Sequence, residues 1–256
     1  MKNIFNWLDS LKGRKELPIK SLPSQGIFYA NDFKLWIKKV KVEDILEYEK
    51  LYTSDISVVL VLIKKIVQLY TTLPSKYTFD YIKSTDIIFI FLEIVRFATN
   101  RAVKIDYYND ISGISESIEL VPDNFNYFDV PKALKNTFNP ETKEFIVDGY
   151  KFSVPSIGIE TSLTQFLVEK SYAKDIEEYN NYAYDFLYFL GNKSRLTFAE
   201  IDNLIEIFNK DMSDEEKTKV NNIVNSFRGF AKYVIKDKNR VIEVNNRIDL
   251  EKVWKS

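Results

Sequence analysis

The strongest constraint on the fold lies in residues 21–51, where a turn is followed by two different hydrophobic periodicities. Pro23 fixes its own φ angle, and Gly26 can adopt the positive φ that a tight turn often needs. From Phe33 to Val40 apolar and polar residues alternate, as in a strand with one buried face. After Val42 the apolar spacing becomes helical, and the first turn is acidic, which the helix dipole favours. The stretch therefore predicts a turn, an amphipathic strand and the start of a helix.

A second unit with the same strand-then-helix order follows the clearest hairpin signal in the chain. Asp148-Gly149 suits a tight primed turn, and it separates the alternating segments Phe145–Val147 and Tyr150–Val154. Pro155 ends the second strand, and residues 160–170 then have helical character. Because this order repeats that of residues 33–51, the pattern predicts two related halves around one sheet.

Two further β-hairpins are predicted from alternating residues on both sides of a turn. They occupy residues 103–121 and 233–244. The alternation in these segments is short, and polar turn residues divide each into two strands.

The helices are predicted from longer apolar periodicities and from their capping residues. Residues 55–70 and 87–99 are long enough to be buried helices, and Ser84–Asp86 is placed to cap the second. Residues 175–190 form another, rich in tyrosine and phenylalanine, and two capping-box patterns open a helical hairpin at Thr197–Glu200 and Ser213–Glu216. The predicted fold class is α+β, with mixed helices and several short β-hairpins.

Three parts are expected along the chain. Residues 1–17 form an amphipathic N-terminal helix and a linker; residues 18–191 form the α+β core, with the hairpin at 101–121 as an insertion; residues 192–256 form the helical hairpin and the C-terminal β-hairpin. The N-terminal helix is expected to dock on its own domain or on a partner, because a membrane-surface helix usually has a richer basic face. No apolar run approaches the roughly 18 residues that a membrane span needs.

The chain contains neither histidine nor cysteine. This composition excludes disulfides, thiolate nucleophiles, Cys/His zinc sites and every mechanism with imidazole as the base. The acidic residues Asp106, Asp110 and Glu116 do not have the spacing of a calcium loop, and the glycines are too isolated for a phosphate loop. No metal, cofactor or catalytic residue is therefore predicted.

Two functional alternatives remain open on the residues alone. Lys38, Lys39 and Lys41 form a small basic run beside Trp36, which suggests a platform for stacking a nucleic-acid base. The net charge of −1 provides no general attraction for nucleic acid, so no nucleic-acid partner is expected. The other alternative is an enzyme that uses lysine, tyrosine or carboxylates, although no paired constellation can be identified.

The stretch Leu22-Pro-Ser-Gln-Gly-Ile-Phe-Tyr29, followed by a strand and a helix, resembles the start of the T-even-type phage baseplate hub assembly proteins, a family of myophage tail proteins. In that family a central and a C-terminal segment often carry Cys-x-x-Cys hairpins that resemble zinc knuckles. The matching places in this chain are 103–121 and 233–244, which keep the hairpin pattern and have no cysteine. A β-hairpin packed on a core can persist without a metal clamp.

The resemblance implies a non-enzymatic role in the central hub of a contractile phage tail, as an assembly factor or as a hub subunit. It implies other tail and hub proteins, or a second copy, as partners. It places the protein in the cytoplasm of the infected bacterial host during assembly, or in the tail baseplate of the virion. No cofactor is implied.

Aromatic residues make up 15% of the chain, and they are favoured in protein interfaces because they give large, rigid contact areas. Trp36 lies on the strand face opposite Phe33, Leu35 and Ile37, so it is exposed unless another segment covers it. The predicted protein-interaction residues are Phe5, Trp7, Leu8, Phe28, Tyr29, Trp36 and Trp254.

Overall fold

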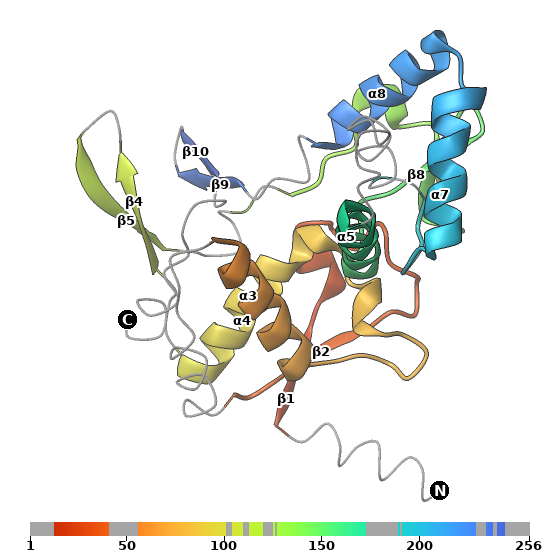
Figure 1. Ribbon diagram of the computed structural model, residues 1–256. Coiled ribbons are helices and arrows are strands. Elements are labelled where there is room, and N and C mark those ends of the chain that lie inside the picture. Colours follow the sequence, from red (N-terminus) through yellow and green to blue (C-terminus); the bar gives the residue numbers. More distant parts are fainter. Residues whose placement is uncertain are drawn as a thin grey trace, which may run out of the picture.

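A computed structural model describes most of the chain, and its α+β class confirms the predicted fold class (Figure 1). The residues that it describes are 13–40, 56–100, 104–109, 113–119, 125, 127–172, 189, 191–228, 234–237 and 240–243. The predicted helices at 1–11, 42–51 and 175–190 lie almost wholly outside these residues.

The first half contains a three-stranded antiparallel sheet and two apolar helices. The sheet has the order β1 (Arg14–Leu17), β2 (Leu35–Lys38) and β3 (Thr71–Thr72). Helix α3 (Ile56–Tyr70) directly precedes β3. Helix α4 (Ile87–Thr99) packs against α3. Both helices are where the sequence predicts them, because their apolar runs are too long for strands of this sheet.

The predicted linker before residue 18 is partly a strand. Arg14–Leu17 pairs with β2 in antiparallel register, and Leu17 lies opposite Leu35 with only 2% of its surface exposed. The segment has a single apolar residue among charged ones, which makes it look like a linker in the sequence. Such a composition suits an edge strand, where charges face water.

Strand β2 is shorter than predicted, and Trp36 on its second face is buried. Leu35, Trp36 and Ile37 are all buried, so both faces of this central strand are covered. The sequence left open whether another segment covers Trp36, and the structure shows that it is covered. Alternation along one strand cannot reveal a second layer on its other side.

The second half contains its own antiparallel sheet, in the order β6 (Phe138–Asn139), β7 (Glu144–Val147) and β8 (Tyr150–Phe152). The β7–β8 turn confirms the predicted hairpin, with Asp148 and Gly149 at φ angles of 50° and 83°. Two consecutive positive φ angles are what a primed turn requires. The prediction that both halves share one sheet is wrong, because β2 and β8 lie in separate sheets.

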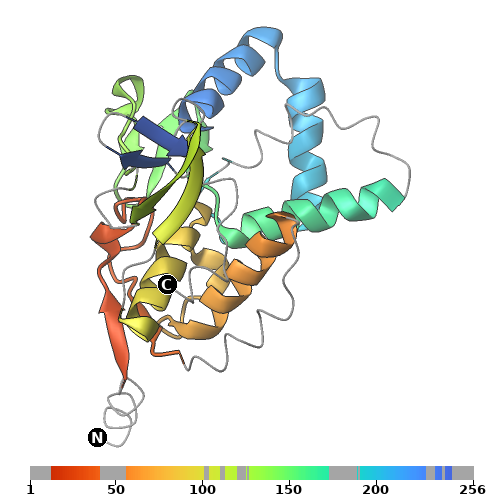
Figure 2. The same cartoon turned by 90° about the vertical axis from the view of Figure 1, so that its left-hand side faces the viewer.

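Helix α5 (Ile157–Tyr172) follows the second sheet, as predicted, and it lies against α3 (Figure 2). At their contact the Lys64 amine is 2.5 Å from a Glu160 carboxylate oxygen. The chain then forms α7 (Phe198–Glu206), a π-helical turn (Ile207–Asp211) and α8 (Asp214–Arg228). Both predicted capping boxes are present, since Glu200 and Glu216 each exchange hydrogen bonds with Thr197 and Ser213 respectively.

The two remaining hairpins are at the predicted positions. Strands β4 (Lys104–Asn109) and β5 (Ile114–Glu119) form an antiparallel ribbon that extends from the body of the protein in Figure 1. Strands β9 (Val234–Asp237) and β10 (Arg240–Glu243) form the other. Single turns of 3-10 helix occur at Ile19–Ser21, Phe79–Tyr81, Ser84–Asp86 and Lys132–Leu134.

The described apolar side chains gather into two clusters. The first joins the β1–β2–β3 sheet to α3 and α4, and the second joins the β6–β7–β8 sheet to α5, α7 and α8. Phe227 of α8 lies in the second cluster, with its ring centroid 5.3 Å from that of Phe145. In the parts of the chain that the structure describes, no helix has the length and apolar character to cross a membrane.

Candidate functional site

Three of the predicted interaction residues are buried, so they are wrong as surface contacts. Phe28, Tyr29 and Trp36 have exposed fractions of 0%, 2% and 8%. Phe5, Trp7, Leu8 and Trp254 lie outside the described residues. Aromatic character alone does not distinguish a side chain that anchors a partner from one that anchors the protein's own core.

The turn at residues 22–29 lies between the two apolar clusters. The Phe28 ring belongs to the second cluster, where it meets the edge of Phe128 at 5.0 Å between centroids. The adjacent Tyr29 ring belongs to the first cluster, where it stacks on Phe33 at 4.3 Å. Gly26 adopts the predicted positive φ, at 71°. This short stretch therefore ties both halves of the fold together.

Asp86 holds the turn at residues 22–29 in place through hydrogen bonds. The sequence predicts that Ser84–Asp86 caps α4. Asp86 does precede this helix, but its side chain makes no capping hydrogen bond. Its Oδ1 accepts a hydrogen bond from the Ser24 backbone N–H at 2.8 Å, and its Oδ2 accepts from the hydroxyls of Ser24 at 2.7 Å and Tyr29 at 2.8 Å. Burial raises the pKa of Asp86 to about 6, and these hydrogen bonds oppose the increase.

Lys83 is the second ionisable group in this buried region, with 1% of its surface exposed. Its backbone N–H donates to the Tyr29 hydroxyl at 2.9 Å, and its amine donates to Asn192 Oδ1 at 2.5 Å. Desolvation lowers the pKa of Lys83 to about 7, although the nearby carboxylates of Asp86 and Glu144 act in the opposite direction.

Asn192 completes the connection to the second half of the chain. Its side-chain amide donates to the carbonyls of Phe28 at 3.1 Å and Thr142 at 3.2 Å, and its backbone N–H donates to Glu144 Oε1 at 2.8 Å. We refer to this network as the buried junction. It consists of Ser24, Tyr29, Lys83, Asp86, Glu144 and Asn192.

The buried junction has the residue types of an enzyme site and the burial of a structural one. A lysine of lowered pKa beside a carboxylate and a phenol is typical of catalytic clusters. Ser24, Lys83 and Asp86 are all at most 1% exposed, so a substrate would have to displace the surrounding chain to reach them. We therefore assign the network to fold specification. Sequence reasoning missed it because its contacts join distant residues; Asn192 and the Phe28 carbonyl to which it donates are 164 positions apart.

Exposed apolar side chains give a different set of contact candidates from the predicted one. Val61 and Leu69 project from α3 with 61% and 47% of their surface exposed, and Ile114 at the start of β5 is 58% exposed. Among the described residues, the other large apolar side chains that are exposed belong to Ile146, Val168 and Phe198. Val61 and Leu69 are eight positions apart and lie on one side of the helix. They form a small apolar surface opposite the side that faces the core.

Within the described ranges no group of three or more acidic side chains could hold a metal ion. Comparisons with family models, with curated proteins and with solved structures find no match for this chain.

Lys83 gives a testable pH dependence. Between pH 7 and the ordinary lysine value of 10.5, the unfolded chain binds this proton and the folded chain does not, so stability rises with pH. Each pKa unit corresponds to about 1.4 kcal/mol, so the rise from pH 7 to pH 9 is expected to be about 2–3 kcal/mol. In Lys83→Met this contribution is expected to disappear, as measured by urea unfolding at several pH values.

The difference between wild type and variant removes the titration of the groups that do not interact with Lys83. Lys65→Met, at an exposed position of α3, is the matched control and is expected to keep the wild-type rise. An equal rise in Lys83→Met and wild type would show that the buried amine does not cause it.

Proposed function

We propose that this protein acts through protein–protein contacts in the assembly of the central hub of a contractile phage tail baseplate, as an assembly factor or as a hub subunit. The observation that carries the proposal is the combination of Leu22-Pro-Ser-Gln-Gly-Ile-Phe-Tyr29 with hairpins at residues 104–119 and 234–243, the places that the family resemblance implies. In this fold Ser24 and Tyr29 of the stretch donate hydrogen bonds to Asp86 in the buried junction, and Gly26 adopts a positive φ in the turn.

The β4–β5 ribbon supports a role in binding. A two-stranded ribbon is marginally stable by itself in water, so packing on another surface stabilises it. Ile114 at its turn end is 58% exposed, and the ribbon extends from the body of the protein (Figure 1). We therefore place one contact with a tail protein on this ribbon.

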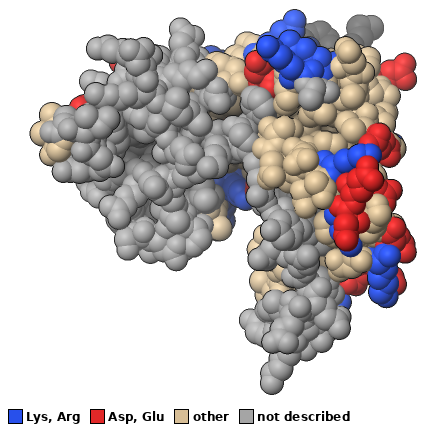
Figure 3. Space-filling view, turned by 90° about the horizontal axis from the view of Figure 1, so that it is seen from above, with Lys and Arg blue, Asp and Glu red and all other residues tan. Residues whose placement is uncertain are grey.

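The observations favour protein over nucleic acid as the partner. The Trp36 ring, which would have stacked a base, is only 8% exposed. The amine of Lys38 donates to the Leu69 carbonyl at 3.3 Å. On the face in Figure 3, patches of both signs are interleaved over the described residues, which gives little attraction for a phosphate backbone.

Purification of the tagged protein from phage-infected cells tests the proposal. Tail hub proteins are expected among the recovered proteins, identified by mass spectrometry, and Ile114→Asp is expected to reduce their recovery because it places a charge in the ribbon contact. Lys210→Ala, an exposed change beyond α7, is the matched control. Recovery of no tail protein, or salt-sensitive binding to DNA instead, would contradict the assembly role.

A further inference from the structure

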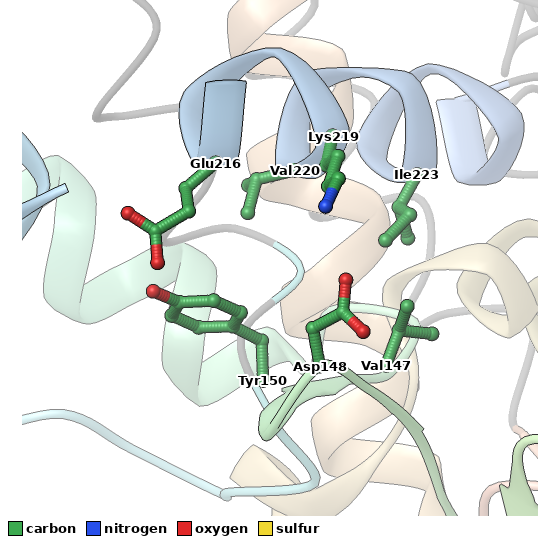
Figure 4. A pocket seen from close by; sticks show the side chains of 7 residues that line it. All are labelled: Val147, Asp148, Tyr150, Glu216, Lys219, Val220 and Ile223. Atoms are coloured by element: carbon green, nitrogen blue, oxygen red, sulfur yellow. The ribbon is translucent and has the colours of Figure 1, made fainter. Parts of the chain in front are cut away.

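A small pocket lies between the β7–β8 turn and α8, and its lining includes none of the residues of the buried junction. Its volume is about 160 Å³, and its lining comes from both elements (Figure 4). The turn contributes Val147, Asp148 and Tyr150, and the helix contributes Glu216, Lys219, Val220 and Ile223.

The pocket has an apolar floor and a charged rim. Val147, Val220 and Ile223 supply aliphatic surface, and Val220 also belongs to the core beneath. In Figure 4 the Lys219 amine and the Asp148 carboxylate face each other across the opening, and the Glu216 carboxylate faces the Tyr150 hydroxyl. A cavity of this size lined by aliphatic groups accepts a group about as large as benzene.

The charges of the rim are predominantly acidic. The Lys219 amine is 3.5 Å from Glu215, so its charge is partly balanced on its own helix. Glu216 accepts hydrogen bonds at the start of α8 from the backbone N–H and hydroxyl of Ser213, which lower the pKa of its carboxyl group. Asp148 is exposed at a turn. Two carboxylates therefore border the pocket, and they favour a ligand with positive charge beside its apolar group.

From this geometry we infer that the pocket binds a peptide segment of a partner protein, which inserts one aliphatic side chain between flanking lysine or arginine residues. The aliphatic chain fills the floor, and the flanking cations face Asp148 and Glu216. This inference deepens the proposed function, on which it rests for taking a protein as the partner. The charge pattern and the apolar floor distinguish the segment from a polar or acidic one.

Peptide titration of the full-length protein with isotope-labelled valine and isoleucine methyl groups tests the inference. The probe is acetyl-Lys-Leu-Lys-amide, which is expected to shift the Val147, Val220 and Ile223 methyl signals and to saturate at roughly millimolar concentration. Acetyl-Lys-Ser-Lys-amide removes the apolar group, and acetyl-Glu-Leu-Glu-amide reverses the flanking charge. Each is expected to bind about ten-fold more weakly.

Asp148→Asn separates a specific site from a general apolar patch. Asparagine suits a primed turn, so this variant keeps the hairpin while it removes one rim charge. It is expected to weaken binding of the Lys-Leu-Lys probe and to reduce the preference over Glu-Leu-Glu. Shifts confined to other methyl groups, equal binding of the serine peptide, or no shift because the chain's own residues fill the pocket would each overturn the inference.

The titration involves no tail protein, so its outcome is independent of the purification from infected cells. A pocket that fails to bind peptide leaves the recovery of hub proteins as it stands. Recovery of no hub protein leaves a peptide site with a different protein as its partner.

Discussion

Asp86→Ala is expected to lower the free energy of unfolding by about 3–5 kcal/mol, since it removes the carboxylate that pairs with the other groups of the buried junction. The backbone N–H and the hydroxyl of Ser24 lose their acceptor, and so does the hydroxyl of Tyr29. The Lys83 amine also loses a favourable charge in a region that water does not reach. The substitution also removes the free-energy cost of burying a carboxylate. This gain is smaller than the losses, because the three hydrogen bonds that Asp86 accepts already offset much of that cost. Urea unfolding at neutral pH measures the change.

Asp32→Ala is the matched control, because Asp32 also accepts a tyrosine hydroxyl and pairs with a lysine. Its hydrogen bond with the Tyr77 hydroxyl is exposed, and the side chains of Asp32 and Lys76 are 58% and 57% exposed. Water replaces such contacts readily, so the control is expected to be much less destabilised. Equal losses in the two variants would mean that the buried junction does not specify the fold.

Gly158→Ala is the second substitution expected to have a large effect. A Cβ at this position in the first turn of α5 would overlap the carbonyl oxygen of Ser194 and lie 2.7 Å from the Cβ of Asp80. The first of these neighbours is backbone, so relief requires a shift of the loop around residue 194. The Ser156 hydroxyl donates to the carbonyls of Lys193 and Ser194 at this contact, which ties the loop to the helix.

We expect Gly158→Ala to cost about 3 kcal/mol or more, since overpacking of rigid neighbours is destabilising. Thermal unfolding measures the loss. Gly149→Ala is the comparison, because its Cβ would meet nothing within 4 Å and only its φ of 83° is unfavourable. That left-handed conformation costs roughly 1–2 kcal/mol. A Gly158→Ala protein as stable as Gly149→Ala would mean that α5 and the loop do not pack this closely.

The sequence predicts the local elements well where the signal is short-range. Asp148-Gly149 gives its hairpin, the two capping boxes start α7 and α8, and the apolar runs give α3 and α4. Each depends on residues within a few positions of one another. Edge strand β1 is the counter-example, because it pairs with residues of β2 that are 18 to 24 positions away, and Leu17 is its single apolar residue.

The buried junction could not be predicted, because its residues meet only after both halves have packed. Asp86 looks like a helix cap, and Phe28 and Tyr29 look like interface aromatics, until the packing places them inside. Trp36 shows the same limit, since periodicity describes one strand and not the layers on either side of it. The exposure of apolar residues such as Val61 in a helix and Ile114 in a strand could not be predicted either, because apolar residues at both positions fit the pattern of their element.

The span of the hydrogen bond between Asn192 and Phe28 has a consequence for biosynthesis. The two residues are 164 positions apart, so Asn192, whose side-chain amide binds the Phe28 carbonyl, is synthesised long after the turn that contains Phe28. The nascent chain therefore carries Phe28 without this anchor until Asn192 has left the ribosome, and a chain truncated before that point lacks it altogether.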